Sequence, residues 1–264
     1  MPPHSLRPAF PLAPFIESLE YIQGETVPAL ERILPAARVH LMVNLDQDEF
    51  RTYSGGVVYR TSGAILEGPH SRATVIDTIE QRHLLSVNFS LGGAARFFRI
   101  PLSETRDQLV DLDQLWGRDG AVLRERLLEA PDPQARLKIV ESVLLRRLLD
   151  SQSPDPMIPF AARAFEQGAS VSSVTSRLGL LPKTFVRRFR GHTGLSPKRY
   201  SRVRRLQRLV SSVPQSGADW AALAALHGFT DQAHLIHDFR ELTGLTPASY
   251  RPRSPHEYNH VPGP

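Results

Sequence analysis

The sequence contains no cysteine among its 264 residues. This absence excludes disulfide bonds, thiolate nucleophiles, thiolate zinc sites and thiol redox chemistry together. The sequence also has no run of about 20 apolar residues that could span a bilayer. The opening residues, MPPHSLRPAFPLAP, lack the basic and apolar segments of a secretory signal. We therefore expect a cytoplasmic protein with no membrane partner.

Acidic residues are absent between Glu166 and Asp219, although the whole chain has a formal charge of only +5. The cations in this interval are Arg177, Lys183, Arg187, Arg188, Arg190, Lys198, Arg199, Arg202, Arg204, Arg205 and Arg208. A solvated helix face usually alternates Glu with Lys to gain pairing at i,i+4, and that pattern is missing here. The unrelieved positive charge indicates the phosphates of nucleic acid as a partner.

The N-terminal part of the sequence is typical of β-structure. Residues 39–45 and 85–89 alternate apolar and polar side chains with the period of two that a strand requires. Turn residues occupy positions 54–56 (Ser-Gly-Gly) and 67–69 (Glu-Gly-Pro). We therefore predict a β-rich region before Pro101.

A helical pattern follows Pro101. Asp132 is a candidate N-cap, with Pro133 in the first helical position. The apolar stripe of this helix consists of Leu137, Val140, Leu144 and Leu148. Such a stripe forms either core packing or a dimer contact, and packing is the commoner case.

Polar and proline-rich composition at 150–156 (DSQSPDP) marks a domain boundary. We predict an N-terminal domain over 1–150, β-rich and then helical, and an all-α domain over 157–251. The tail, 252–264, has too few apolar residues to pack, so we expect it to be disordered.

The strongest pattern is an internal repeat: the segment 193–200 (TGLSPKRY) recurs at 243–250 (TGLTPASY), 50 residues later. Further pairs match at the same offset, namely Phe185 with Leu235, Phe189 with Phe239, and Arg190 with Arg240. Thr-Gly is typical of a helix end and Ser-Pro or Thr-Pro of a helix start. A short apolar helix and a glycine, Gly179 or Gly228, precede each copy. The order is that of two helix-turn-helix units joined by a long helix.

The second helix of each unit has an apolar side that predicts which residues face outward. Phe185 and Phe189 point inward in the first unit, as do Leu235 and Phe239 in the second. The outward candidates for contact with DNA bases are Lys183, Val186, Arg187, Gln232, Ala233, Ile236 and His237. These types can donate to guanine, pair with adenine or pack on the thymine methyl group. Candidates for phosphate contact are Arg190, Lys198, Arg199, Arg202 and Arg240.

The C-terminal residues resemble the DNA-binding module of the AraC family of transcription regulators. The matching residues are Leu223-Ala224, Gly228-Phe229, Asp231-Gln232, His234-Leu235, Asp238-Phe239, Gly244, Pro247 and Tyr250-Arg251. The first unit departs from the family pattern at Thr175, Leu181 and Arg188. The resemblance implies a transcription regulator of double-stranded DNA, with the same outward residues reading two successive major-groove segments. It also implies RNA polymerase as a partner, a homodimer, and control by a small-molecule effector.

The N-terminal region is similar to an uncharacterised domain that precedes some AraC-type modules. The residues that carry this similarity are Leu34-Pro35, Gly68-Pro69-His70, Phe89, Gly92-Gly93-Ala94-Ala95, Phe97-Phe98 and Pro101-Leu102. It implies a cupin-like barrel followed by helices, acting as a sensor or dimerisation element. The expected fold class is therefore α+β, with an all-α C-terminal domain.

Signals for catalysis are weak. His40, His70 and His83 lack the compact His-x-His spacing of a cupin metal site, so structural roles fit them better. The pair 92–93 has no GxGxxG context and fits a turn. No nucleophile elbow orients a Ser, His and Asp set. We therefore expect no enzyme, metal or cofactor.

Three alternatives accompany this interpretation. DNA-alkylation repair proteins carry AraC-type modules in some cases, but their methyl transfer needs a nucleophilic cysteine, which is absent. A sequence-indifferent nucleic-acid binder would discriminate little between duplexes. A metal-dependent enzyme fused to a regulator would bind metal in its barrel.

Overall fold

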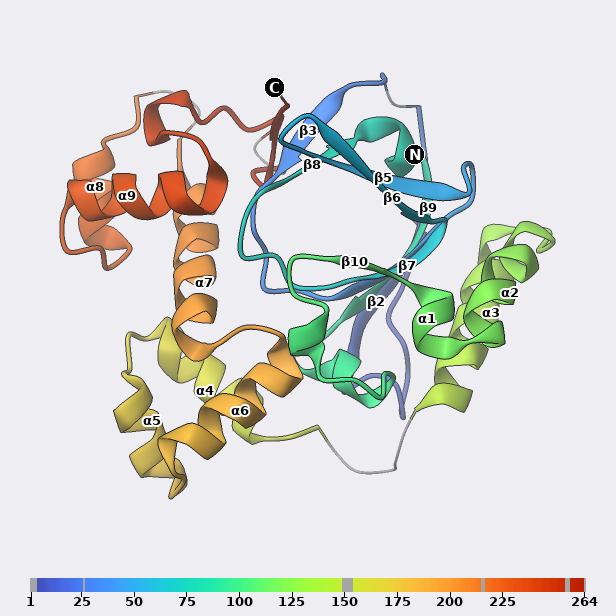
Figure 1. Cartoon of the computed structure of the whole chain (residues 1–264), viewed down its shortest axis with the longest axis horizontal. Coiled ribbons are helices and arrows are strands. Elements are labelled where there is room, and N and C mark those ends of the chain that lie inside the picture. Colours follow the sequence, from blue (N-terminus) through green and yellow to red (C-terminus); the bar gives the residue numbers. More distant parts are fainter. Residues whose placement is uncertain (1–3, 26, 149–153, 215–216, 255–256, 264) are drawn as a thin grey trace.

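The computed structural model describes residues 4–25, 27–148, 154–214, 217–254 and 257–263. Figure 1 shows a β-rich half in the centre, a layer of helices at its right edge and a second group of helices at its left. This arrangement is the expected α+β architecture with an all-α C-terminal part. The predicted boundary at 150 lies outside the described residues.

The first of two antiparallel sheets contains the alternating segments noted in the sequence. Its strands, in spatial order within the described residues, are β1 (His4–Leu6), β2 (Ile16–Gln23), β9 (His83–Phe89), β4 (His40–Asn44), β7 (Ala64–Glu67) and β10 (Leu109–Asp111). Leu41 and Leu85 are fully buried on the face that packs against the helices drawn at the right of Figure 1, within residues 112–147. His40 and Ser86 lie on the opposite face, toward the second sheet. The period of two is thereby confirmed.

The second sheet faces the first and encloses a cavity with it. Its strands, in order within the described residues, are β11 (His260–Pro262), β3 (Leu30–Ile33), β8 (Thr74–Asp77), β5 (Glu49–Ser54) and β6 (Val57–Ser62). The predicted turn at 54–56 joins β5 to β6, where Gly55 and Gly56 take left-handed φ angles of 57° and 79°. Short 3-10 helices connect the strands, η1 (Thr78–Gln81), η2 (Gly93–Arg96) and η3 (Leu102–Glu104).

Three helices cover the outer face of the first sheet: α1 (Leu112–Trp116), α2 (Arg118–Leu128) and α3 (Pro133–Arg147). Helix α3 begins as predicted, because the Asp132 side chain accepts a hydrogen bond from the Ala135 amide. Val140 and Leu144 are buried in the core that α3 shares with β2 and β9. This part of the predicted stripe therefore serves core packing.

The C-terminal half contains six helices among the described residues: α4 (Met157–Glu166), α5 (Val171–Leu178), α6 (Pro182–Thr193), α7 (Pro197–Ser212), α8 (Trp220–Leu226) and α9 (Gln232–Thr243). A 3-10 turn, η4 (Pro247–Ser249), follows them. The repeated Thr-Gly pairs end α6 and α9, and both glycines are left-handed, with φ 76° at Gly194 and 73° at Gly244. No helix in the described ranges is long and apolar enough to span a membrane.

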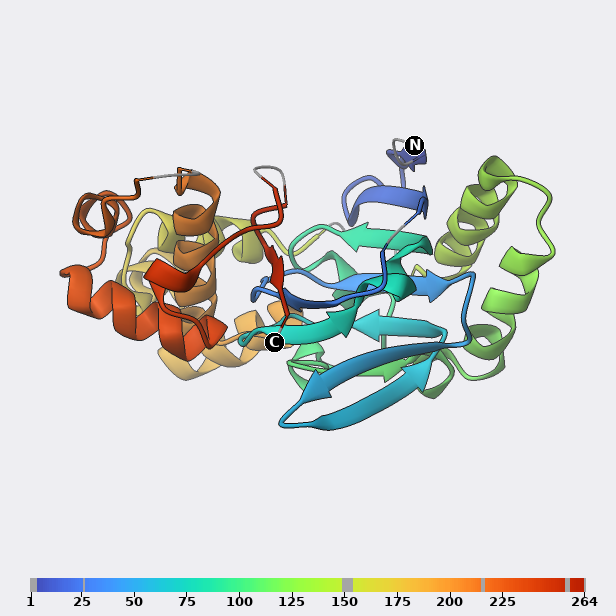
Figure 2. The ribbon, with the colours of Figure 1, turned by 90° about the horizontal axis from the view of Figure 1, so that it is seen from above.

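The tail differs from our expectation of disorder. Residues 260–262 form β11, which adds to the edge of the second sheet with Val261 opposite Arg32 of β3. Figure 2 shows this red segment leaving the helical half and lying along the sheet. His260 Nδ1 lies 2.8 Å from the carboxylate of Glu31, 229 positions earlier in the chain. Because the pairing partner is so distant, the local composition of the tail does not indicate it.

Candidate nucleic-acid interface

The first helix-turn-helix unit consists of α5 and α6 packed on α4 and the start of α7. Phe185 and Phe189 are fully buried, and their rings pack edge-on against Phe165 of α4. Helix α6 begins without a side-chain cap, because Leu181 occupies the N-cap position and is 74% exposed. The buried aromatic pair fixes the rotation of α6 about its own axis.

That rotation places Lys183 and Arg187 on the exposed surface of α6, together with Arg190 near its end. Val186 is only half-buried and packs against the edge of the unit's own core. The structure thus brings the predicted cations together on one surface and gives Val186 a packing contact as well.

The second unit consists of α8 and α9 on the other end of α7. Asp231 caps α9 by accepting a hydrogen bond from the His234 amide at 2.7 Å. Leu235 and Phe239 are buried in the core, as predicted. The turn before α9 is longer than the turn before α6, yet Phe239 and Phe189 take equivalent buried positions. The turns absorb the one-residue difference noted between the units.

The outward surface of α9 carries the remaining predicted base-contact residues. Gln232, Ala233 and His237 are exposed, while Ile236 is half-buried. A shallow depression is lined by Ala233, Ile236, His237, Arg240 and Glu241. Each unit therefore presents one outward helix face made of the residues that the sequence predicted.

Helix α7 joins the two units, and its first turn is capped by the Ser196 hydroxyl, as predicted. Lys198 is exposed on this turn. Arg199 donates from Nη1 to the Ser71 hydroxyl of the N-terminal half at 3.2 Å. Two of the phosphate candidates therefore stand at the same helix start, one of them in contact with the barrel.

Arg202 is bound to carboxylates of α9. Its guanidinium donates to Asp238 at 2.8 Å and to Glu241 at 2.6 Å, and the side chain of Asp238 is only 8% exposed. Donation to Glu241, and to a smaller extent to Asp238, raises the pKa of Arg202 against the opposing effect of burial. In this structure Arg202 holds α9 against α7.

Carboxylates from outside the acid-free interval neutralise several of its arginines. Arg188 pairs with Asp155 at 2.7 Å, and Arg204 pairs with Glu166 at the same distance. Together with Arg202 these pairs reduce the positive charge that we inferred from the interval alone. Sequence reasoning missed them because a run of residues does not show which distant carboxylates fold onto it. Lys183, Arg187, Arg190 and Lys198 form no ion pair within the described residues.

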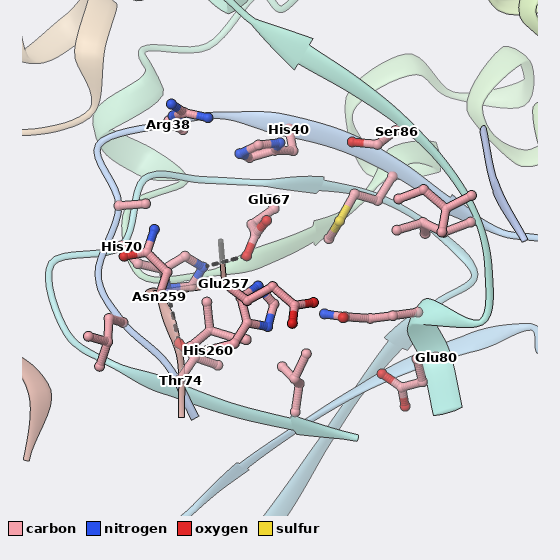
Figure 3. Close-up of a pocket in the computed structure, with 18 of the residues that line it drawn as sticks. Arg38, His40, Glu67, His70, Thr74, Glu80, Ser86, Glu257, Asn259 and His260 are labelled. Atoms are coloured by element: carbon pink, nitrogen blue, oxygen red, sulfur yellow. Dashed lines mark hydrogen bonds and ion pairs between the residues drawn. The ribbon is translucent and has the colours of Figure 1, made fainter. Parts of the chain in front are cut away.

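A second candidate site is the cavity of about 570 Å³ between the two sheets. Figure 3 shows Arg38, His40, Glu67, His70 and His260 among the side chains that line it. Helix α7 and the tail also contribute to its lining. The cavity therefore touches both halves of the molecule.

The three histidines considered as metal ligands all have protein partners. His40 Nδ1 lies 2.6 Å from Asn88 Oδ1, and His83 Nε2 lies 2.8 Å from the Tyr21 hydroxyl. His70 Nε2 lies 3.2 Å from Glu67 Oε1. Among the described residues, potential metal-ligand atoms of three side chains lie close together at His237, Asp238 and Glu241. However, Arg202 already binds both of these carboxylates. A cation there would have to compete with the guanidinium.

Glu67 and His70 form a largely buried pair beside the cavity, with His70 Nε2 3.2 Å from Glu67 Oε1. Burial opposes ionisation of both groups, but the hydrogen bond and charge of the partner outweigh it. The pKa of Glu67 is therefore lowered and that of His70 is raised. Both shifts favour the charged form of a group that lines the cavity.

Comparison with known families agrees with this division of the chain. Residues 174–253 match a family of helix-turn-helix domains, and residues 4–111 match a domain of unknown function, DUF6597. No curated protein matches the chain. The first region includes both helix-turn-helix units except the start of α5, and the second includes every strand of the two sheets except β11.

Among solved structures, the chain is similar to ToxT from Vibrio cholerae. A 1.65 Å resolution structure of ToxT has a TM-score of 0.44 and 12% sequence identity, covering 88% of this chain and 96% of that one. A structure of wild-type ToxT bound to an unsaturated fatty acid has a TM-score of 0.44 and 12% identity, covering 88% of this chain and 92% of that one.

The two packed units and the family match define the class of protein: it is a DNA-binding transcription regulator. Its C-terminal region is an AraC-type helix-turn-helix domain, placed behind an N-terminal domain of unknown function.

Proposed function

We propose that this regulator reads two successive major-groove segments of duplex DNA, with α6 and α9 as the recognition helices. The main support is that each helix buries its apolar side in a separate core and exposes hydrogen-bonding side chains. An α-helix fits the major groove, where each base pair presents a distinct pattern of donors and acceptors. Two units on one connecting helix suit segments about one helical turn, or 34 Å, apart.

We assign base contacts to the exposed faces of the two helices. In the first unit, Lys183 and Arg187 can donate to guanine O6 and N7, and Val186 can pack on a thymine methyl group. In the second unit, Gln232 can form paired hydrogen bonds with adenine N6 and N7. The neighbouring residues assigned to the same groove are Ala233, Ile236 and His237.

We assign phosphate contacts to cations beside these faces, namely Arg190, Lys198, Arg199 and Arg240. Such contacts set the register of the protein on the duplex without specifying a sequence. Arg202 was a further candidate, but its donors are bound to Asp238 and Glu241. We therefore assign Arg202 to positioning α9, with direct phosphate contact requiring release of these carboxylates.

Selection of binding sites from a random duplex library by the full chain tests this proposal. We expect a motif of two short elements, about 10 base pairs apart, the geometry of one helical turn. Gln232→Ala should remove base preference in one element, and Arg187→Ala in the other. Recovery of duplexes without any common motif would favour the sequence-indifferent binder instead.

We also propose that a small molecule bound in the cavity between the sheets controls this regulator, which acts in the cytoplasm. The support is the position of the cavity: its lining combines the barrel with α7 and with the tail that follows the second unit. We also propose that the protein forms a homodimer through its N-terminal domain and contacts RNA polymerase. Both follow from the resemblance to the AraC family.

A thermal unfolding screen of the full chain against small metabolites tests the effector. A ligand at about 100 times its Kd should stabilise the protein by roughly 2.7 kcal/mol. Ser86→Trp, which fills the cavity from β9, should abolish the shift while leaving duplex binding intact. A shift that persists in this variant would place the ligand elsewhere.

A further inference from the structure

The loop that joins β7 to β8, residues 68–73, contacts both helix-turn-helix units. At the first unit, a β-carbon added to Gly194 would lie 2.3 Å from Pro69 Cγ, so the loop closely approaches the end of α6. The hydroxyl of Ser71 accepts the hydrogen bond from Arg199 at the start of α7. At the second unit, the Ala73 amide donates to the Leu242 carbonyl at 2.9 Å. One short loop of the barrel therefore bridges the two units.

The contacted segments lie at the two copies of the internal repeat, 193–200 and 243–250. Gly194 lies in the first copy, and Leu242 directly precedes the second copy at Thr243. Arg32 of β3 adds a hydrogen bond to the Thr243 carbonyl at 3.2 Å. The barrel thus contacts the end of each recognition helix at or next to the repeated segment.

The side chain in the middle of this loop points the other way, into the cavity. His70 lies between Pro69 and Ser71, and its ring contacts Glu67 at the end of β7 and Thr74 at the start of β8. Figure 3 shows these three side chains close together in the wall of the cavity, with His70 joined to its two partners by dashed lines. A molecule in the cavity would meet His70 directly.

The backbone of the loop is closely packed and hydrogen-bonded to its surroundings. A β-carbon on Gly68 would lie 1.8 Å from the Thr105 carbonyl, so only glycine fits there. The His70 amide donates to the Ala36 carbonyl at 2.9 Å, and the Ser71 hydroxyl donates to Asp107 at 2.8 Å. Because the loop is packed this closely, we expect a displacement of His70 to alter the contacts of its neighbours, Pro69 with Gly194 and Ser71 with Arg199.

We propose that the loop 68–73 couples the cavity to both helix-turn-helix units: a ligand with a polar or charged group that contacts Glu67 and His70 changes the grip of the loop on the two repeated turns. This inference rests on the proposed control by a small molecule and identifies its transmission element. The ligand class follows from the polar side chains of Glu67 and His70 in the cavity wall, 3.2 Å apart, which a polar group can solvate and an apolar group would leave unsolvated. Its effect is to change the restraint on the ends of α6 and α9 together.

Hydrogen exchange of the full chain, without ligand or DNA, tests the coupling. His70→Gln removes the imidazole that lies beside Glu67, so we expect roughly tenfold faster amide exchange around 193–199 and 239–246, the effect of losing one polar contact. The matched control is His83→Gln, since His83 lies on β9 and contacts Tyr21, away from the loop. Exchange at both turns should stay unchanged in this control.

Ser71→Ala separates the two branches of the coupling and guards against a folding defect in His70→Gln. Ser71 contacts Arg199, so this variant should speed exchange around 193–199 and leave 239–246 unchanged. Unchanged exchange at both turns in His70→Gln, or equal acceleration in His83→Gln, would overturn the coupling. Because no DNA is present, failure here is distinguishable from failure of groove reading, which duplex selection tests.

Discussion

The two helix-turn-helix units share a repeat but differ in how their recognition helices are held and charged. Helix α6 has no side-chain cap and carries exposed Lys183, Arg187 and Arg190. Helix α9 is capped by Asp231, and its acidic residues are occupied by Arg202 from the connecting helix. The same fold thus presents a cationic face in one unit and a nearly neutral, hydrogen-bonding face in the other.

This difference indicates a division of labour. Attraction to phosphate is long-ranged and indifferent to sequence, whereas neutral amide contacts discriminate between bases. We infer that the first unit contributes more of the affinity and the second more of the specificity. Since the ion pairs of Arg202 belong to only one unit, they also make the second unit depend on α7 for its position.

The largest expected effect is a loss of stability when the ion pairs that hold α9 against α7 are removed. Arg202→Ala leaves the buried Asp238 carboxylate without its main partner, and His234 stays 3.6 Å away. The free energy of unfolding should fall by about 3 kcal/mol, the lower end for loss of one member of a buried pair. Denaturant titration with tryptophan fluorescence measures it, with Arg208→Ala on the same helix as control. An equal loss in both variants would contradict the role of Arg202.

The next effect should separate specificity from affinity. Gln232→Ala should cost about 1 to 3 kcal/mol on a selected duplex and almost nothing on a random one. Arg187→Ala should weaken both, because a guanidinium also attracts phosphate. Competition binding followed by fluorescence anisotropy measures the two ratios. If Gln232→Ala reduced binding to both duplexes equally, the second unit would not be the main reader.

A smaller effect should follow from the helix caps. Asp231→Ala removes the cap of α9 and should lower stability by about 1 kcal/mol. Leu181→Ser supplies the missing cap to α6 and should raise stability by up to about 1 kcal/mol. Thermal unfolding of the full chain measures both. A stabilising Asp231→Ala would show that the capping geometry is not formed in solution.

The smallest effect should appear in the salt dependence of binding. Lys198→Ala should weaken binding on all duplexes alike and lower the slope of log affinity against log salt by about one. Arg199→Ala should change the slope less, because Arg199 is hydrogen-bonded to Ser71 in the free protein. Titrations at several salt concentrations compare the two variants. Identical slopes in Lys198→Ala and the unchanged chain would remove Lys198 from the phosphate contacts.

Much of the candidate site was predictable because its signals are local. The period that buries Phe185 and Phe189 also determines that Lys183 and Arg187 face outward. The roles of Arg188, Arg202 and Arg204 were not predictable, since their carboxylate partners come from other segments. The charge counted along the sequence therefore overestimated the positive charge exposed on α6 and α7.

The sequence by itself determined the repeated unit, the ends of its helices and their apolar faces, because turn residues and helical periodicity act over a few positions. Tertiary structure alone decided that the tail becomes β11 and that the loop 68–73 meets both repeats. These contacts join residues far apart in the chain, and their strength depends on burial that no local pattern shows. Coupling between the cavity and the recognition helices belongs to this second group.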